Sequence, residues 1–256
     1  MQYEYLFHKK QNHIVIVDFP DIPIRQVDKL QLANELRDLF SGLSWDSEVR
    51  AVLVKWKQKQ RPLLEENWTE GFYWLEEDNM RQGSLSLPVE QLEIPVITCI
   101  EGYAIGQGLE LALAGDIRVA TKGSWFGLPQ IQMGLIPWDG GTQRLPRLVG
   151  KSKALEMILT GEIINAEEAL RIGLIHKVVE SGRLDKEAMD MAKTMCTRGP
   201  VALRYAKEAI KKGTEMPIEQ ALRLEADLYL LIHTTRDRTE GITAFREKRK
   251  AIFEGR

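Results

Sequence analysis

The sequence has few of the residues that mark disulfide-rich or metal-binding proteins. It contains only two cysteines, Cys99 and Cys196, which lie far apart and form neither a metal-binding nor a redox spacing. This usage is typical of free thiols in a reducing compartment. The four histidines show no pairing that indicates a metal site or a catalytic triad. We therefore expect no metal.

Long hydrophobic runs and an excess of one charge are also missing. The first ten residues lack the apolar stretch of a signal peptide, and no later run reaches the roughly 20 apolar residues of a membrane span. The 35 basic and 37 acidic residues give a net charge of −2. Such a balance provides no overall field for nucleic acid or an anionic membrane surface. We expect a soluble cytoplasmic protein that binds neither.

The first part of the chain alternates between strand and helix patterns. Residues 14–17 and 49–54 read as strands, and residues 27–40 between them read as a helix. This alternation is typical of βαβ units in an α/β protein. Residues 55–80 are charged and rich in tryptophan but show no clean period, so we predict only a loop and a helix there.

From residue 151 onward the pattern is almost entirely helical, and residues 236–256 form a final basic helix in this interpretation. No internal repeat, low-complexity tract or flexible linker separates this part from the rest. The length of 256 residues allows one large core with a smaller appendage. We expect a core over residues 1–195 and a helical region over residues 196–256 packed on it.

The middle of the chain carries a glycine-rich turn between a strand and a helix. Residues 95–100 read as a buried strand, 102–108 as a turn, 107–114 as a helix, and 116–120 as a further strand. A helix start presents unpaired backbone N–H groups at the positive end of the helix dipole. This turn is therefore a candidate site for an oxyanion or a phosphate.

Two common motifs do not explain this turn. Residues 106–108 begin like a dinucleotide-binding fingerprint, but the third glycine position holds Leu111 and the position twenty beyond Glu110 holds Gln130, not an acid. The turn also contains no serine nucleophile elbow. What remains is a carboxylate, Glu110, one helical turn inside the helix start. There it can move a proton beside a carbonyl held by the backbone, which is the geometry that enolate chemistry needs.

Ordered sequence blocks extend on both sides of this turn. They are IPVI at 94–97, GYAIG at 102–106, ELA at 110–112, DIRVA at 116–120, FG at 126–127, GLIP at 134–137, GGTQRLPRLVG at 140–150 and LTG at 159–161. Together they resemble the crotonase superfamily, the enoyl-CoA hydratase/isomerase family, densely over residues 93–179 and again over residues 240–253. The resemblance implies an α/β fold with a crotonase-like ββα spiral core and a C-terminal helical trimerisation region.

The resemblance also implies an enzyme that acts on an acyl-CoA thioester, with coenzyme A as part of the substrate and no separate cofactor. The thioester carbonyl would be held by the backbone N–H groups of Gln107 and Phe72. A donor at Gln107, where the family has glycine, requires a negative φ. Glu110 matches one of two glutamates of the hydratases, and Gln130 stands at the other. Because glutamine does not exchange a proton near neutral pH, two-carboxylate hydration cannot operate unchanged.

Further positions follow from the same resemblance. Asp139 lies on the loop that approaches the acyl end and is a candidate partner for Glu110. Trp74 and Trp138 fall where the acyl pocket is expected and suggest a bulky or cyclic acyl group.

Phe245 and Lys248 match a terminal segment that contacts the adenine and phosphates of CoA, often across a subunit boundary. The family forms trimers that pair into hexamers, so a homotrimer or homohexamer is expected.

Each candidate has a plainer interpretation. Glu110 would be an exposed helix carboxylate, Gln130 a neutral replacement, and Asp139 an N-cap of the following helix. The aromatic residues would belong to the core, and the basic tail would be a solvated face. Three hypotheses stay open: an enoyl-CoA hydratase; an isomerase, decarboxylase or ring-cleaving hydrolase, which Gln130 favours; and a non-catalytic acyl-CoA-binding subunit.

Overall fold

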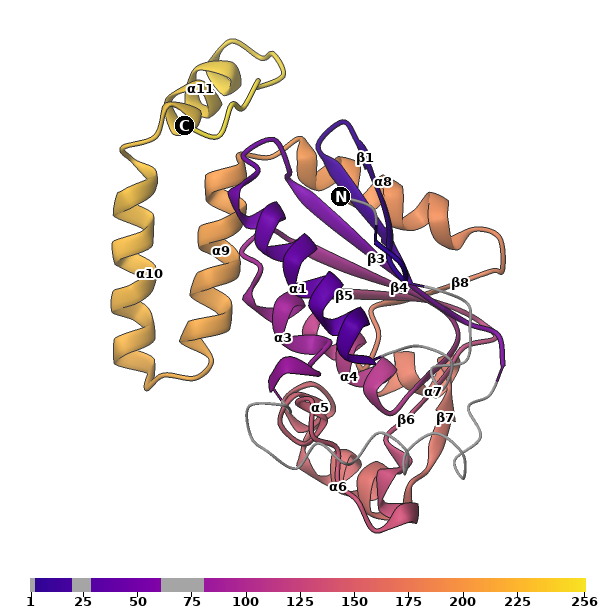
Figure 1. Ribbon diagram of the computed structural model, residues 1–256. Coiled ribbons are helices and arrows are strands. Elements are labelled where there is room, and N and C mark those ends of the chain that lie inside the picture. The colour runs from indigo at the N-terminus through magenta and orange to yellow at the C-terminus, as the bar shows by residue number, and fades with distance from the viewer. Residues whose placement is uncertain (1–2, 20–28, 61–80) are drawn as a thin grey trace.

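A computed structural model describes residues 3–19, 29–60 and 81–256 (Figure 1). Its central feature is a mostly parallel sheet in the order β1-β2-β3-β4-β5-β8, and β4 also pairs with β6, which pairs with β7. β1 is antiparallel to β2, and β6 is antiparallel to β7. The strands are β1 (Phe7–Gln11), β2 (Ile14–Asp18), β3 (Ala51–Gln58), β4 (Val96–Ile105), β5 (Ile117–Thr121), β6 (Trp125–Gly127), β7 (Ile163–Asn165) and β8 (Lys177–Val179).

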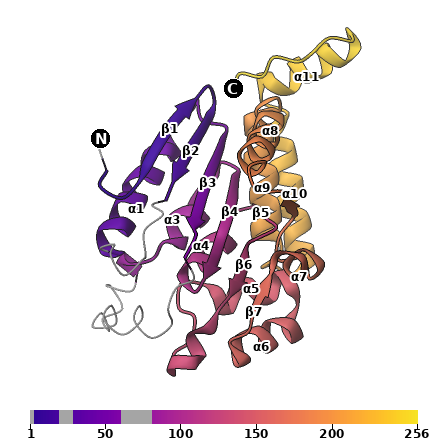
Figure 2. The same ribbon diagram turned by 90° about the vertical axis from the view of Figure 1, so that its right-hand side faces the viewer.

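Helices cover both faces of the sheet. α1 (Lys29–Trp45), α3 (Ser86–Gln91) and α4 (Gln107–Ala114) pack on one face, and α8 (Leu184–Cys196) packs on the other (Figure 2). Because strand side chains alternate between faces, Val15 and Val17 join the first core while Ile14 and Ile16 join the second. A sheet buried on both sides explains why its strands are continuous apolar runs. The predicted α/β class is confirmed.

β4 is longer than the sequence indicated and reaches directly into the turn before α4. The turn predicted over residues 102–108 is wrong for most of its length, since the strand continues to Ile105 and leaves only Gly106 before the helix. Gly102 has φ 86° and pairs with Gln58, whose carbonyl oxygen would lie 2.0 Å from a Cβ at that position. Glycine therefore lets the strand pass close to β3 where another residue would end it.

Other boundaries also differ from prediction. β3 extends to Gln58, so the loop or helix predicted from residue 55 is wrong over its first residues, because Val52 to Gln58 pair with β4. α1 runs to Trp45, five residues beyond the predicted end. The predicted helical stretch after residue 151 is interrupted by β7 and β8. It also contains α6 (Lys151–Thr160) and α7 (Ala166–Arg171), which follow α5 (Gly141–Val149).

Three helices form the C-terminal part: α9 (Pro200–Gly213), α10 (Ile218–Ile232) and α11 (Arg236–Arg246). α10 runs antiparallel to α9 at the edge of the molecule, and α11 projects beyond them (Figure 1). Lys207 ties α9 to the core, because its Nζ lies 2.6 Å from Asp116 Oδ2. The final helix predicted over residues 236–256 is wrong after Arg246. Lys248 adopts φ 55°, and the chain returns so that the Arg236 N–H donates to the Arg256 carbonyl oxygen at 2.8 Å.

No helix within the described ranges is long and apolar enough to cross a membrane.

Candidate active site

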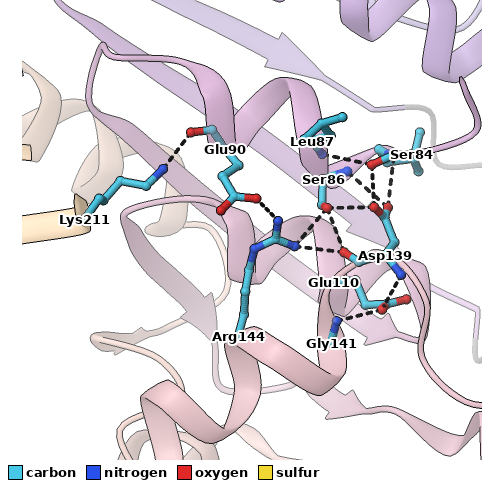
Figure 3. Close-up of polar contacts among 10 residues, drawn as sticks. Ser84, Ser86, Leu87, Glu90, Glu110, Asp139, Gly141, Arg144 and Lys211 are labelled. Carbon is cyan, nitrogen blue, oxygen red and sulfur yellow. Dashed lines mark hydrogen bonds and ion pairs between the residues drawn. The ribbon is translucent and has the colours of Figure 1, made fainter. Parts of the chain in front are cut away.

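Glu110 lies one turn inside α4 and is fully buried. The interpretation of this residue as an exposed carboxylate is therefore wrong. Its Oε1 accepts hydrogen bonds from the backbone N–H groups of Asp139 and Gly141, each at 2.8 Å (Figure 3). Within the described part of the chain, its Oε2 is reached by one donor, Gln130 Nε2, at 3.4 Å. One oxygen is thus fixed by the backbone, and the other is weakly held.

The pKa of Glu110 is raised from 4.5 to about 7. Burial is the largest cause, because a charged carboxylate is poorly solvated in the interior, and the nearby carboxylate of Asp139 raises the pKa further. The backbone N–H groups of Gly141 and Asp139 and the charge of Arg144 oppose this shift. A carboxyl group with a pKa near neutrality can both accept and return a proton at physiological pH.

Gln130 is fully buried in a short 3-10 helix, Pro129–Met133. Its Oε1 has no hydrogen-bond partner among the residues that the structure describes. A buried acceptor without a partner costs about 1–3 kcal/mol, so such groups mark places where a ligand or water can bind. Beside Glu110, this amide can orient a polar molecule but cannot exchange a proton with it.

The start of α4 is fixed by close packing. Gly108 lies against Trp56, and a Cβ on Gly108 would be 2.4 Å from the indole Cζ2. The indole Nε1 in turn donates to the Tyr103 carbonyl oxygen at 2.9 Å, which ties the end of β4 to the same ring. In the described residues other than glycine, positive φ occurs at Asn12 and Lys248, so Gln107 keeps the negative φ that its predicted donor role requires. Trp56 was not among the predicted site residues, and the glycine at 108, which leaves room for the indole ring, is the local sign of this contact.

The Asp139 side chain caps a helix, but not the one that was predicted. α5 has Gly140 as its N-cap without a side-chain cap bond. Asp139 Oδ2 instead accepts from the N–H groups of Leu85 and Ser86 at 2.9 and 3.1 Å, at the start of α3. The Ser84 hydroxyl donates to Oδ1 at 2.5 Å. The sequence predicted a cap on the helix that follows Asp139, whereas the capped helix is α3. Its start lies more than 50 residues earlier in the chain, so a local pattern could not indicate it.

Arg144 extends this network across three helices (Figure 3). Its Nη1 donates to the Asp139 carbonyl oxygen at 2.8 Å and to Ser86 Oγ at 2.9 Å. Its Nη2 forms an ion pair with Glu90, whose carbonyl oxygen accepts from Lys211 Nζ at 2.6 Å. The loop that holds Glu110 is thereby bound to α3, α5 and α9. Apart from the bond between Arg144 and Asp139, which are five positions apart, these contacts join residues far apart in the chain, so no local sequence pattern predicts them.

Comparison with known proteins is consistent with this geometry. The family profile described as enoyl-CoA hydratase/isomerase matches residues 72–256. The chain belongs to this family. It is 35% identical to the Bacillus subtilis protein YngF over 98% of both chains, and 44% identical to the crotonyl-CoA hydratase of Syntrophomonas wolfei over 64% of each. The crystal structure of an enoyl-CoA hydratase from Bacillus anthracis superposes with a TM-score of 0.88 at 33% identity, covering 99% of this chain and 100% of that one.

Membership of this family confirms the resemblance that the sequence blocks indicated, and the superposition confirms the predicted crotonase-like fold. It also shows that the chain is an enzyme of this family. The roles of individual residues stay predictions. Of the predicted pocket and oxyanion residues, Phe72 and Trp74 lie outside the described residues, while Trp138 is half-buried next to Asp139.

In this family member, the predicted CoA contacts are not close to Glu110 within one chain. Phe245 is 85% exposed on α11, and Lys248 follows that helix at the surface. Both views place α11 at one end of the molecule, away from α4, which lies near the middle (Figures 1 and 2). The neighbouring Arg249 is engaged in an ion pair with Glu240 at 2.6 Å. The CoA-binding role of Phe245 and Lys248 therefore stays a prediction.

Proposed function

We propose that this protein adds water to, or removes it from, an acyl-CoA thioester through an enolate, as an enoyl-CoA hydratase does, with Glu110 as general acid and base. The observation that carries the proposal is Glu110 itself: a buried carboxyl with a pKa of about 7, one turn inside the start of α4. The backbone N–H groups of Gln107 and Phe72 would hold the thioester oxygen. Donors at that position stabilise the negative charge that develops there.

One carboxylate is sufficient for a balanced hydration. Ionised Glu110 accepts a proton from water while the water oxygen bonds to C3, and the C2–C3 π electrons move into the thioester to form the enolate. Protonated Glu110 then delivers that proton to C2, which restores the carboxylate. Gln130 would orient the water, because its Oε1 accepts and its Nε2 donates hydrogen bonds.

A second candidate function is a shift of the double bond, and Gln130 is the observation that favours it. Isomerisation needs one base, which removes a C2 proton from a 3-enoyl-CoA and returns it to C4. Water addition by the two-glutamate route would need an acid or base where Gln130 stands, whereas isomerisation uses Glu110 alone. Both reactions share the enolate and the oxyanion donors.

Product masses separate these functions. The wild-type protein would be incubated with linear and cyclic 2-enoyl- and 3-enoyl-CoA thioesters, beside the Glu110→Gln and Gln130→Glu variants. A gain of one water that Glu110→Gln abolishes supports hydration, whereas a product of unchanged mass with a moved double bond supports isomerisation. Tight binding of every thioester without turnover would contradict both and leave a binding subunit. Turnover of cyclic or bulky acyl groups would support the predicted pocket at Trp74 and Trp138.

We also propose that the active form is a homotrimer or a homohexamer, in which Phe245 and Lys248 of a neighbouring copy bind the CoA adenine and phosphates. Large apolar side chains are exposed on α10, namely Ile218, Leu222, Tyr229, Leu230 and Leu231. Such a surface is typical of an interaction face. Light scattering on the purified protein tests the assembly; a monomer at micromolar concentration would contradict it.

Coenzyme A would enter as part of the substrate, with no resident cofactor. A cytoplasmic location is the matching proposal, supported by the free thiols of Cys99 and Cys196. Fractionation of the source cells with an antibody against the chain tests the location.

A further inference from the structure

Gln107 and Asp139 lie on different elements but are joined by their side chains. Gln107 is the first residue of α4, and Asp139 lies on the loop before α5. Both side chains are buried, with 6% and 5% of their surface exposed. The Gln107 Nε2 donates to Asp139 Oδ2 at 3.3 Å and to the Gly83 carbonyl oxygen at 3.0 Å.

The backbone of each residue takes part in the site. The N–H of Asp139 donates to Glu110 Oε1 at 2.8 Å, and the N–H of Gln107 stands at the helix start, where the proposed function places the thioester oxygen. The two residues therefore contribute their main chains to opposite halves of the site and bind each other through their side chains. This side-chain link is not local, since 32 residues separate Gln107 from Asp139 in the chain.

The surroundings of Asp139 make this link stiff. Its carboxylate also accepts from the N–H groups of Leu85 and Ser86, so α3 holds the same oxygen that Gln107 reaches. Arg144 binds the carbonyl oxygen of Asp139 at 2.8 Å. With its side chain, carbonyl and N–H all bonded, Asp139 has little freedom to move. Displacing it would move the donor to Glu110 and leave the Gln107 amide without one of its acceptors.

We propose that Gln107 and Asp139 are paired positioning residues that fix the distance between the oxyanion donor and the acid/base carboxylate. The inference rests on the proposed function, because it assigns the pair to enolate formation. It gives Asp139 a different part from that of a proton-transfer partner for Glu110. A reacting geometry is sensitive to such placement, since small misalignments of catalytic groups lower rates strongly.

The test uses the Gln107→Ala, Asp139→Ala and double variants of the full chain. Gln107→Ala keeps the backbone N–H and removes the side-chain hydrogen bonds to Asp139 and to the Gly83 carbonyl oxygen. Acetoacetyl-CoA is the probe, because its enolate absorbs in the near ultraviolet and the ratio of bound enolate to keto form can be read without turnover. We expect each single variant to lower that ratio about tenfold, and the double variant to lower it no further than Asp139→Ala alone, since residues in contact are not additive.

A matched control separates positioning from simple helix capping. Asn165 caps α7 through its side chain, which accepts from the Glu168 N–H at 2.9 Å, far from the pair in sequence. Asn165→Ala should lower the thermal midpoint and leave the enolate ratio unchanged. If Asp139→Ala behaves in the same way, Asp139 is only a cap and the proposal is overturned.

The remaining outcomes also decide the question. Multiplicative losses in the double variant would show two independent residues and overturn the pairing. If Asp139→Ala does not fold, Gln107→Ala decides alone, because an unchanged enolate ratio there removes the link from the mechanism. If the wild-type protein forms no enolate and turns over no thioester, the proposed function fails and the pair falls with it. If the wild-type protein turns over thioesters but the effects of the two single variants simply combine in the double variant, only the pairing is overturned and the proposed function stands.

Discussion

Gln130 Nε2 lies 3.4 Å from Glu110 Oε2, and both side chains are fully buried. The contact is longer than the ~3 Å of a typical N–H···O bond, so Gln130 constrains this oxygen only weakly. The opposite oxygen of the same carboxyl accepts two bonds of 2.8 Å from Asp139 and Gly141. Glu110 therefore has one structural oxygen and one oxygen available to react.

Glu110→Gln should abolish most of the activity. The amide keeps the shape of the side chain, and its oxygen can still accept from Asp139 and Gly141, but it cannot carry a proton. We expect a loss of kcat of about 10²- to 10⁴-fold with little change in thioester binding. Steady-state kinetics and direct binding of the thioester measure the two quantities. An active Glu110→Gln variant would remove Glu110 from the reaction.

The same substitution should increase stability at alkaline pH. The folded-state pKa of Glu110 is about 7, above its ordinary 4.5, so folding favours the protonated form. Its stabilising contribution is fully present below pH 4.5 and is lost as the pH rises through about 7. Relative to Glu110→Gln, the wild-type free energy of unfolding should fall by about 2–3 kcal/mol between about pH 5 and pH 8. Urea unfolding at both pH values measures it; a constant difference would contradict the raised pKa.

Asp139→Asn should move the pH dependence of catalysis to lower pH. The negative charge of Asp139 is one of the causes that raise the pKa of Glu110, so its removal lowers that pKa below about 7. The acidic limb of kcat/KM, which rises as Glu110 ionises, should shift in the same direction. Asp190→Asn is the matched control, because Asp190 is an exposed carboxylate on α8. A shift of the acidic limb to higher pH would contradict the prediction, because it would show that the substitution changed the burial of Glu110 more than the charge beside it.

Alanine at Gly108 should destabilise the protein and impair the site. The new Cβ would lie 2.4 Å from the Trp56 ring, which must then move away from the start of α4. We expect a loss of about 1–3 kcal/mol, the usual cost of overpacking. Gly42→Ala in α1 is the matched control, since nothing lies within 4 Å of its Cβ. That variant should gain about 0.5–1 kcal/mol from helix propensity. Thermal unfolding of both variants checks the contrast.

Local patterns predicted the elements around Glu110 well. The helix over residues 107–114 matches α4, since apolar period and glycine punctuation are properties of neighbouring residues. The burial of Glu110 could not be read in this way, because it depends on the loop from Asp139 to Gly141 folding over α4. The same limit applies to Asp139, whose partners Leu85 and Ser86 precede it by more than 50 residues.

The end of β4 shows why the turn was predicted too early. Glycine at 102 reads as a turn signal, yet here it relieves a clash between neighbouring strands. Only the pairing of Gly102 with Gln58, which tertiary structure supplies, distinguishes the two meanings.

The first seven residues of β4 pair with β3, and its last three pair with β6. A strand shared between two sheets makes their registers interdependent, because a slip of one residue in either would turn its side chains to the wrong face of both. The helix start after Gly106 inherits its position from this double pairing. The backbone N–H groups at this helix start therefore move only when both pairings of β4 move. A substitution that loosens β6 should disturb these N–H groups as much as a substitution beside Glu110.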